Sequence, residues 1–260
     1  MTNERKVWSR EETIIAFNLY CKIPFRQTTK NNPMIIQFAE IINRTPSAMS
    51  MKIGNLGRLD PALKERGISG LVNGSKLDEE VWNEFSSDWN GLAFESEKVI
   101  AKLQGVNIRN AAKVKWFSET SSLPEGISRD AVVKVRVNQA FFRSAILSAY
   151  ENKCCITGLA IPQLLVASHI IPWASREDTR TDPRNGLLLN GIHDKAFDFG
   201  LITITEDYKL KLSQYLKDSL PQKIIQEWFI NYSGQRITLP DKFLPSREYL
   251  RWHNENIFKG

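Results

Sequence analysis

Apolar residues recur at helical spacing near the start of the chain. The face running from Ile14 to Tyr20 predicts a first helix. Ser9 and Glu12 lie three residues apart just before this face and form the pattern of a capping box, in which each side chain bonds the other's backbone N–H. Pro24 closes the helix.

Two further helices follow, each announced by a capping residue and a proline. Asn32-Pro33 predicts the start of the second and Thr45-Pro46 the start of the third. The three helices predict a helix-turn-helix-like domain over residues 1–90, whose third helix can enter the major groove of DNA. A small helical bundle that only packs or contacts proteins is the alternative. The candidate nucleic-acid contacts here are Arg44, Ser47, Ser50, Lys52 and Asn55.

The helical pattern weakens in the middle of the chain. We interpret residues 91–130 as a connecting segment, helical over Glu95–Leu103 and then a polar linker. Four valines between 132 and 137 predict a strand or an extended arm, and residues 139–150 predict a helix. Arg136 and Arg143 are candidate contacts to a phosphate backbone, although a solvated helix face would explain them equally well.

The C-terminal part changes to a mixed pattern. Leu164–Ile171 is a short apolar run that predicts a buried strand, and 175–182 is a charged loop. Asn185–Leu189 predicts a second strand and Ile192–Phe199 a helix that ends at Gly200. With the helical N-terminal part, this order of strand, loop, strand and helix predicts an α+β fold.

Charge and cysteine content narrow the class of protein. The 260 residues carry a formal net charge of +6 with a pI near 9.2, which favours a polyanionic partner such as DNA. The three cysteines form no C-x-x-C pair, so a disulfide framework or cysteine-based zinc site is not expected. Neither a secretory signal nor an apolar run long enough to span a bilayer is visible, so we expect a cytoplasmic protein without membrane contact.

The mixed segment also holds a concentration of reactive side chains. His169 suits a general base because the unperturbed pKa of histidine lies near neutrality. Asn185 can hydrogen-bond the backbone or orient the imidazole. Asp194 and Asp198 are four residues apart, which places both carboxylates on one face of a helix. Hard oxygen ligands of this kind suit Mg²⁺ or Mn²⁺.

Three phrases carry a resemblance to a known family. The segment 136–205 resembles the HNH endonuclease family, in its bacterial restriction-type branch, and the stretches 8–85 and 245–253 resemble parts that flank such nuclease domains. The resemblance implies a ββα-metal fold that holds one divalent ion between a hairpin and a helix, and a positioning asparagine at Asn185. The phrases are Ala-Ser-His-Ile-Ile-Pro-Trp, Asp-Pro-Arg-Asn-Gly-Leu-Leu-Leu and His-Asp-Lys-Ala-Phe-Asp-Phe-Gly.

The metal ligands follow from the same resemblance, with two departures. The family places its helix ligands nine and thirteen residues after the asparagine, where this chain has Asp194 and Asp198. Many members have histidine at the first of these places, whereas His193 falls one step early. Many also carry aspartate or histidine before the base, where this chain has Ser168. His193 is therefore the alternative ligand for one place, or a phosphate contact.

The chain is thus expected to be a metal-dependent DNA endonuclease with a helical DNA-recognition domain (1–90) and an HNH nuclease domain (131–260). We assign catalysis to His169, Asn185 and His193, and one Mg²⁺ or Mn²⁺ ion to Asp194 and Asp198. Arg184 joins the candidate DNA contacts. Restriction or phage defence, with cleavage of modified DNA, is the expected context, and a homodimer would supply two active sites. The alternatives are a DNA-binding protein with a degenerate HNH domain and a toxin-like nuclease acting on DNA or RNA.

Overall fold

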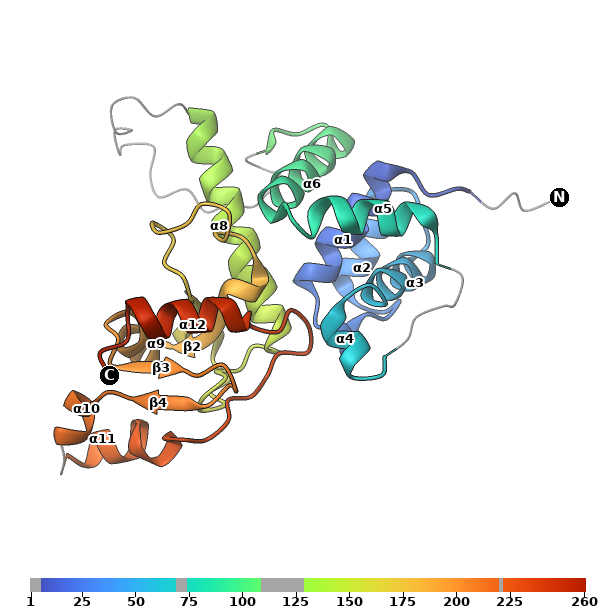
Figure 1. Ribbon diagram of the computed structural model, residues 1–260. Helices are drawn as coiled ribbons and strands as arrows, with labels where there is room; N and C mark the ends of the chain where they lie inside the picture. The colour runs from blue at the N-terminus through green and yellow to red at the C-terminus, as the bar shows by residue number, and fades with distance from the viewer. Residues whose placement is uncertain (1–5, 69–73, 109–128, 220–221) are drawn as a thin grey trace. The chain divides into compact units, whose positions relative to one another are not determined.

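The computed structural model describes residues 6–68, 74–108, 129–219 and 222–260 (Figure 1). These residues form helices and two small antiparallel sheets, which confirms the predicted α+β class. The chain divides into two units, Met1–Ser144 and Ala145–Gly260, and the boundary falls inside one long helix, α8 (Arg129–Ala149). None of the described helices is long and apolar enough to cross a membrane.

Helix α1 (Arg10–Lys22) lies at the centre of the N-terminal unit. Ser9 and Glu12 form the predicted capping box in both directions. Every side chain from Thr13 to Cys21 is buried, which is the condition of a helix surrounded by other helices. The helices that pack against it are α2 (Pro33–Ile41), α3 (Pro46–Gly57), α5 (Lys76–Phe85) and α6 (Trp89–Gln104).

The predicted helix starts are confirmed. The Asn32 side chain accepts a hydrogen bond from the Met34 N–H at the start of α2, and the Thr45 hydroxyl accepts one from the Ala48 N–H in α3. The short helices η1 (Phe25–Gln27) and α4 (Pro61–Glu65) complete this part of the unit.

Two elements differ from the expectation. Helix α6, predicted only in part and as a connection, packs against α1 within the N-terminal unit. The valines near residue 135 lie in α8 and do not form a strand. Val133 and Val137 are both buried and lie four residues apart, so they share one face of the helix. This packing outweighs the few tenths of a kcal/mol by which valine disfavours a helix. The predicted linker at 109–128 lies outside the described residues.

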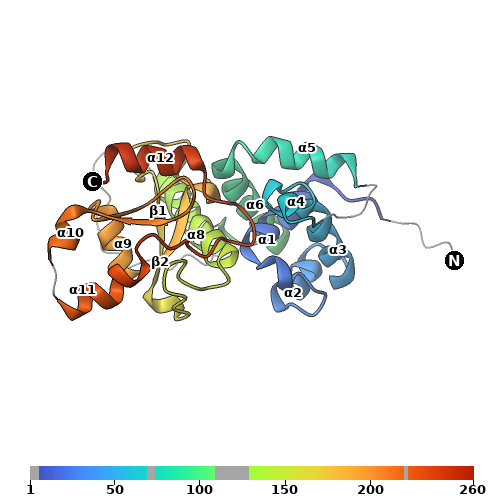
Figure 2. The ribbon, with the colours of Figure 1, turned by 60° about the horizontal axis from the view of Figure 1, so that its bottom comes forward.

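The C-terminal unit is built on a hairpin and a helix (Figure 1 and Figure 2). Strand β1 (Leu165–His169) pairs antiparallel with β2 (Gly186–Asn190), so that Leu165 faces Asn190 and His169 faces Gly186. Helix α9 (Gly191–Asp198) follows β2 directly and packs on both strands. The single turns η2 (Pro162–Leu164) and η3 (Pro183–Asn185) lead into the two strands. The predicted order of strand, loop, strand and helix is confirmed.

A second hairpin and the C-terminal helix cover this unit. Strands β3 (Ile202–Ile204) and β4 (Leu210–Leu212) pair antiparallel, and α12 (Arg247–Asn256) runs along β3 (Figure 1). The short helices α10 (Gln214–Asp218), α11 (Lys223–Trp228) and η4 (Ile230–Tyr232) follow β4. The buried apolar side chains of both hairpins and α9 form one core that fixes α9 against β1 and β2.

Candidate active site

His169 is the last residue of β1, and a hydrogen bond to a backbone carbonyl fixes which of its ring nitrogens carries the proton. Its Nε2 lies 2.9 Å from the carbonyl oxygen of Arg180. Because a carbonyl only accepts, Nε2 carries the hydrogen and the lone pair of the neutral ring is on Nδ1. The Trp173 ring packs edge-on, with 5.6 Å between the ring centroids. Burial lowers the pKa of His169, although the Arg180 carbonyl and the charge of Asp198 oppose the shift. The ring is therefore neutral, as a base must be, at physiological pH.

Asn185 holds the loop that supplies this carbonyl. The side chain is fully buried. Its Oδ1 accepts a hydrogen bond from the Ile171 N–H at 2.8 Å, and its Nδ2 donates to the carbonyls of Ile171 and Thr179 at 3.0 and 3.2 Å. Since Thr179 immediately precedes Arg180, the amide positions the carbonyl that orients His169. Asn185 therefore acts through the backbone rather than on the imidazole or on a water directly.

Asp194 and Asp198 project from one face of α9, four residues apart. Asp194 is buried and the Asp198 side chain is about half exposed. Burial raises the pKa of Asp194 and the negative charge of Asp198 raises it further, while Ser168 and Lys195 partly offset the shift. The two carboxylates repel each other in a partly buried place. A cation bound between them would neutralise this repulsion.

The donor chemistry of this face fits a hard divalent ion. Asp194 and Asp198 offer carboxylate oxygens, the ligands that Mg²⁺ and Mn²⁺ prefer. The Ser168 hydroxyl lies near enough to Asp194 to lower its pKa, yet its buried Oγ meets no hydrogen-bond partner of good geometry among the described residues. It could serve as a third oxygen donor. No group of three His, Cys, Asp or Glu side chains converges as a metal site in the part of the chain that the structure describes.

His193 does not join this cluster. Its Nδ1 accepts a hydrogen bond from the Asn190 amide and its Nε2 donates to the Trp228 carbonyl, both at 2.7 Å. The ring is fully buried against three aromatic side chains. One residue on a helix is a rotation of about 100°, so His193 faces away from the side that carries Asp194. Both ring nitrogens are engaged, which removes His193 from the predicted catalytic and ligand sets.

The candidate DNA contacts of the N-terminal unit separate into two groups. Lys52 is 3% exposed, forms an ion pair with Asp78 and lies over the Trp8 ring. Arg44 pairs with Glu12 at 2.7 Å. These two cations hold the helices together, so their assignment as DNA contacts is corrected.

The remaining candidates of that unit lie nearer the surface. Ser47 is exposed, whereas Ser50 and Asn55 are half-buried and the Ser50 hydroxyl donates to the Thr28 carbonyl. These three stay predictions.

The other candidate cations are accessible. Arg136 and Arg143 are exposed on α8 and lie seven residues apart, so they share one face of the helix. Arg184 is about half exposed and its guanidinium pairs with the buried carboxylate of Asp182 at 2.7 Å. The Tyr249 hydroxyl donates to the same carboxylate at 3.1 Å, which ties α12 to the loop before β2.

The contribution of Arg180 to the site had no sequence signal. It acts on His169 through its backbone carbonyl, which every residue type carries. Its guanidinium lies over the Trp173 ring and donates through Nε to the Trp173 carbonyl at 2.9 Å. From the sequence, only the position of Arg180 in the loop between the two predicted strands could have indicated that its carbonyl lies near His169.

The three cysteines are all buried thiols, and no disulfide joins them. Cys154 lies beside His193 in the C-terminal unit. Burial alone would raise the pKa of its thiol, but hydrogen bonds with His193 and Thr157 outweigh this effect and bring the pKa to about 7. Burial acts in the same direction at Cys155 and dominates there, so the pKa of that thiol is raised.

A hairpin and helix that present a histidine base candidate and an acidic helix face define a ββα nuclease-type site. Residues 154–205 match the family model described as HNH endonuclease. The segment contains His169, Asn185 and both aspartates, and the chain therefore carries a domain of the HNH endonuclease family, as predicted. No curated protein matches the chain.

Proposed function

We propose that the protein is a divalent-metal-dependent DNA endonuclease that serves in restriction or phage defence. His169 is the general base, Asn185 positions it through the 170–185 loop, and Asp194 with Asp198 would hold one Mg²⁺ or Mn²⁺ ion. When bound, the ion would neutralise charge on the scissile phosphate and on the leaving oxygen. Arg136, Arg143 and Arg184 are exposed cations suited to the phosphate backbone.

The observation that carries the proposal is the position of His169, with a fixed tautomer, near the Asp198 carboxylate of α9. Its Nε2–H donates to Arg180, so its basic Nδ1 can take a proton from water. As the proton moves to Nδ1, the water oxygen bonds to phosphorus and the bond to the leaving sugar oxygen breaks. The leaving oxygen then takes a proton from solvent. The ring is neutral at the outset because burial lowers its pKa.

Cleavage of supercoiled plasmid in Mg²⁺ or Mn²⁺ tests the base. His169→Gln keeps an amide N–H that can donate to Arg180 but has no base, and His169→Ala removes both. We expect both variants to lose roughly 10²- to 10⁴-fold in rate. Tyr215→Ala, which changes a 72% exposed side chain on α10, is the matched control. Equal cutting by the wild type and the His169 variants would contradict the role of His169.

The metal role is tested separately. Chelation by EDTA should abolish cutting, and Asp198→Asn should raise the concentration of Mg²⁺ or Mn²⁺ needed for half-maximal cutting, because it removes one charged ligand. DNA binding without turnover in any divalent ion would instead favour a degenerate HNH domain, the reading kept open by Ser168. Comparable cutting of RNA would favour a toxin-like nuclease.

The biological context needs a different measurement. Sequencing the cleavage ends from modified and unmodified genomic DNA would show whether a recognition sequence or a modified base is required. Paired cuts on the two strands with a fixed stagger would support a homodimer, in which each copy brings one active site.

A further inference from the structure

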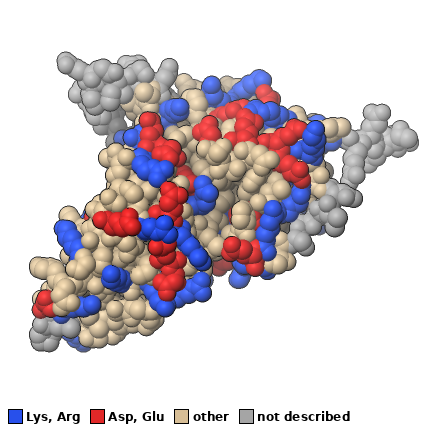
Figure 3. All heavy atoms as spheres, viewed as in Figure 1, with Lys and Arg blue, Asp and Glu red and all other residues tan. Residues whose placement is uncertain are grey.

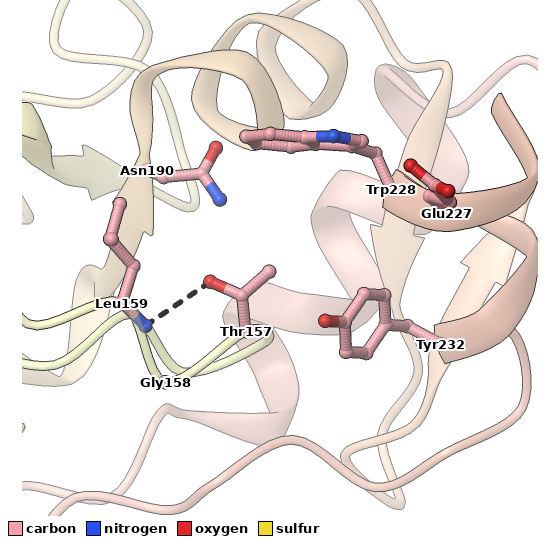
Figure 4. Close-up of a pocket in the computed structure, with 7 residues that line it drawn as sticks. All are labelled: Thr157, Gly158, Leu159, Asn190, Glu227, Trp228 and Tyr232. Carbon is pink, nitrogen blue, oxygen red and sulfur yellow. Dashed lines mark hydrogen bonds between the residues drawn. The ribbon is translucent and has the colours of Figure 1, made fainter. Parts of the chain in front are cut away.

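A cavity of about 330 Å³ lies in the C-terminal unit, apart from the His169 cluster (Figure 4). Asn190 lines the cavity at the end of the hairpin where this residue faces Leu165. His169 lies at the opposite end of the hairpin. Four strand steps separate the two ends, which is roughly 14 Å. Its lining consists of Thr157, Gly158, Leu159, Asn190, Glu227, Trp228 and Tyr232.

The walls of this cavity suit a flat ring. Figure 4 shows the Trp228 ring across the space from the Thr157–Leu159 segment, with Asn190 and Tyr232 on opposite sides. Gly158 has φ near 72°, the left-handed region that favours glycine, so this wall has bare backbone between the side chains of Thr157 and Leu159. A slot between an indole and a peptide segment is a stacking site for a planar group.

The polar groups narrow the ligand further. The Tyr232 hydroxyl points into the space in Figure 4, and the Glu227 carboxylate lies at its rim. Among the described residues that line the cavity, none carries a positive charge. A phosphate would meet no cation among these lining residues, while a neutral ring with N–H donors could meet the Glu227 carboxylate, which also pairs with Lys223 at 3.7 Å. Acidic side chains accept from the exocyclic amino group of cytosine in this way.

Buried hydrogen bonds hold these walls in place. His193 donates to the Trp228 carbonyl and accepts from the Asn190 amide, both at 2.7 Å. The Asn190 Oδ1 also caps α9 by accepting from the Ile192 and His193 N–H groups, each at 3.0 Å. The cavity is thus preformed, which lowers the entropy cost of binding. This accounts for the burial of His193 away from the catalytic face.

We propose that this cavity binds an amino-bearing nucleobase, cytosine or adenine, unstacked from the DNA strand that the enzyme cuts. The inference rests on the proposed nuclease function and adds a base-reading site to it. Enzymes that read an extruded base use hydrogen bonds to its edge together with stacking on aromatic side chains.

The test uses the full-length protein and four probes: cytidine, adenosine, thymidine and uridine, titrated by saturation-transfer NMR. We expect saturable binding of cytidine or adenosine and at least several-fold weaker binding of thymidine and uridine. Tyr232→Ala should weaken the binding on the order of tenfold, because the edge of the base loses its contacts with the Tyr232 ring and hydroxyl. Glu227→Gln, a change at an exposed position, should abolish the preference for amino-bearing bases.

Two controls separate this inference from the proposed function. Tyr215→Ala removes an aromatic ring outside the cavity and should leave nucleoside binding unchanged. His169→Ala should lose cleavage and keep nucleoside binding. Nucleoside binding in a protein that cuts no DNA would support the cavity and sink the nuclease assignment.

The contrary results are equally definite. DNA cleavage without saturable nucleoside binding would overturn the inference alone. Undiminished binding in Tyr232→Ala would also overturn it, because the bound base would lie elsewhere. Equal affinity for all four nucleosides would overturn the assignment of an amino-bearing base.

Discussion

Each of the three histidines of this chain bonds a backbone carbonyl through Nε2. The acceptors are the carbonyls of Arg180 for His169, Trp228 for His193 and Phe197 for His253. At His193 and His253 the second nitrogen meets a side chain of the core, which fixes these rings as structural parts. His169 ends strand β1 near the Asp198 carboxylate of α9. The nearby carboxylate of Asp198 therefore separates the proposed base from the two other histidines, which share its tautomer.

Asn185→Ala should destabilise the C-terminal unit and slow cleavage together. The change leaves the buried Ile171 N–H and two carbonyls without their partner, at roughly 1–3 kcal/mol for each group that stays unsatisfied. Thermal unfolding measures the first effect and plasmid cleavage the second. If the variant unfolds at the wild-type temperature, the 170–185 loop does not depend on this amide.

A conservative variant separates position from stability. Asn185→Asp keeps the Oδ1 acceptor for Ile171 and loses both donors, so Arg180 should shift and the pH profile of cleavage should move with His169. A loss of stability with an unchanged pH profile would show that Asn185 only supports the fold.

How far the sequence predicted the site varies by residue. His169, Asn185 and the two aspartates lie on the hairpin and α9, as expected, because spacing and strand ends are local features. His193 was assigned wrongly because one helical step decides which way a side chain faces. The importance of Arg180 could not be predicted, since a backbone acceptor leaves no mark on residue type.

At the scale of elements, His253 docks α12 on the rest of the C-terminal unit. Its ring stacks on Phe197 of α9, with 3.7 Å between centroids, and its Nδ1 bonds the Thr203 hydroxyl of β3. Burial lowers the pKa of His253 to about 4, although its bond to the Phe197 carbonyl opposes the shift. Helix α12 therefore depends on a neutral imidazole.

This docking should make stability fall in acid. The unfolded chain binds a proton at His253 below pH about 6.5, whereas the folded chain binds it only below about 4. Stability from this group is complete above pH 6.5, and it is lost as pH falls toward 4. The full loss is about 3 kcal/mol, from 1.36 kcal/mol per pKa unit.

Chemical unfolding at several pH values measures this slope. The matched variant His253→Gln retains an amide for Thr203 and Phe197 but does not titrate, so its stability should depend less on pH between 4 and 6.5. A slope identical to that of the wild type would show that another group is responsible.

Elements also show where local pattern was insufficient. Caps such as Ser9 and Asn32 were predicted because their partners are neighbours in sequence. Lys52 was placed on a DNA-facing surface, and its burial depends on Asp78 of α5, 26 residues away. The valines of α8 show the same limit. Local propensity predicted a strand there, but the packing of Val133 and Val137 on one buried face stabilises a helix.

At the scale of the whole molecule, the net charge of +6 is not gathered into one field on the face in Figure 3. Lys and Arg side chains alternate there with Asp and Glu. We therefore expect the proposed binding of DNA to depend on local groups of cations, such as Arg136 and Arg143 on α8.

Replacing both arginines should reduce the salt dependence of DNA binding. Each lost phosphate contact lowers the slope of log K against log salt by about 0.9, so Arg136→Gln with Arg143→Gln should lower it by about 2. Fluorescence anisotropy at several salt concentrations measures this slope.

The matched control is Lys64→Gln with Lys76→Gln, which removes the same charge from other exposed positions of the N-terminal unit. An equal fall in slope for both pairs would show that net charge, and not the face of α8, governs binding.

The burial of all three cysteines has a practical consequence for labelling. Even Cys154, whose pKa of about 7 makes a reactive thiolate, has no exposed surface to offer an alkylating reagent. A cysteine introduced at an exposed position such as Ser47 or Tyr215 would therefore accept a maleimide dye selectively. One dye in each unit would allow energy transfer to test whether added DNA changes the distance between the dyes, without first removing the native thiols.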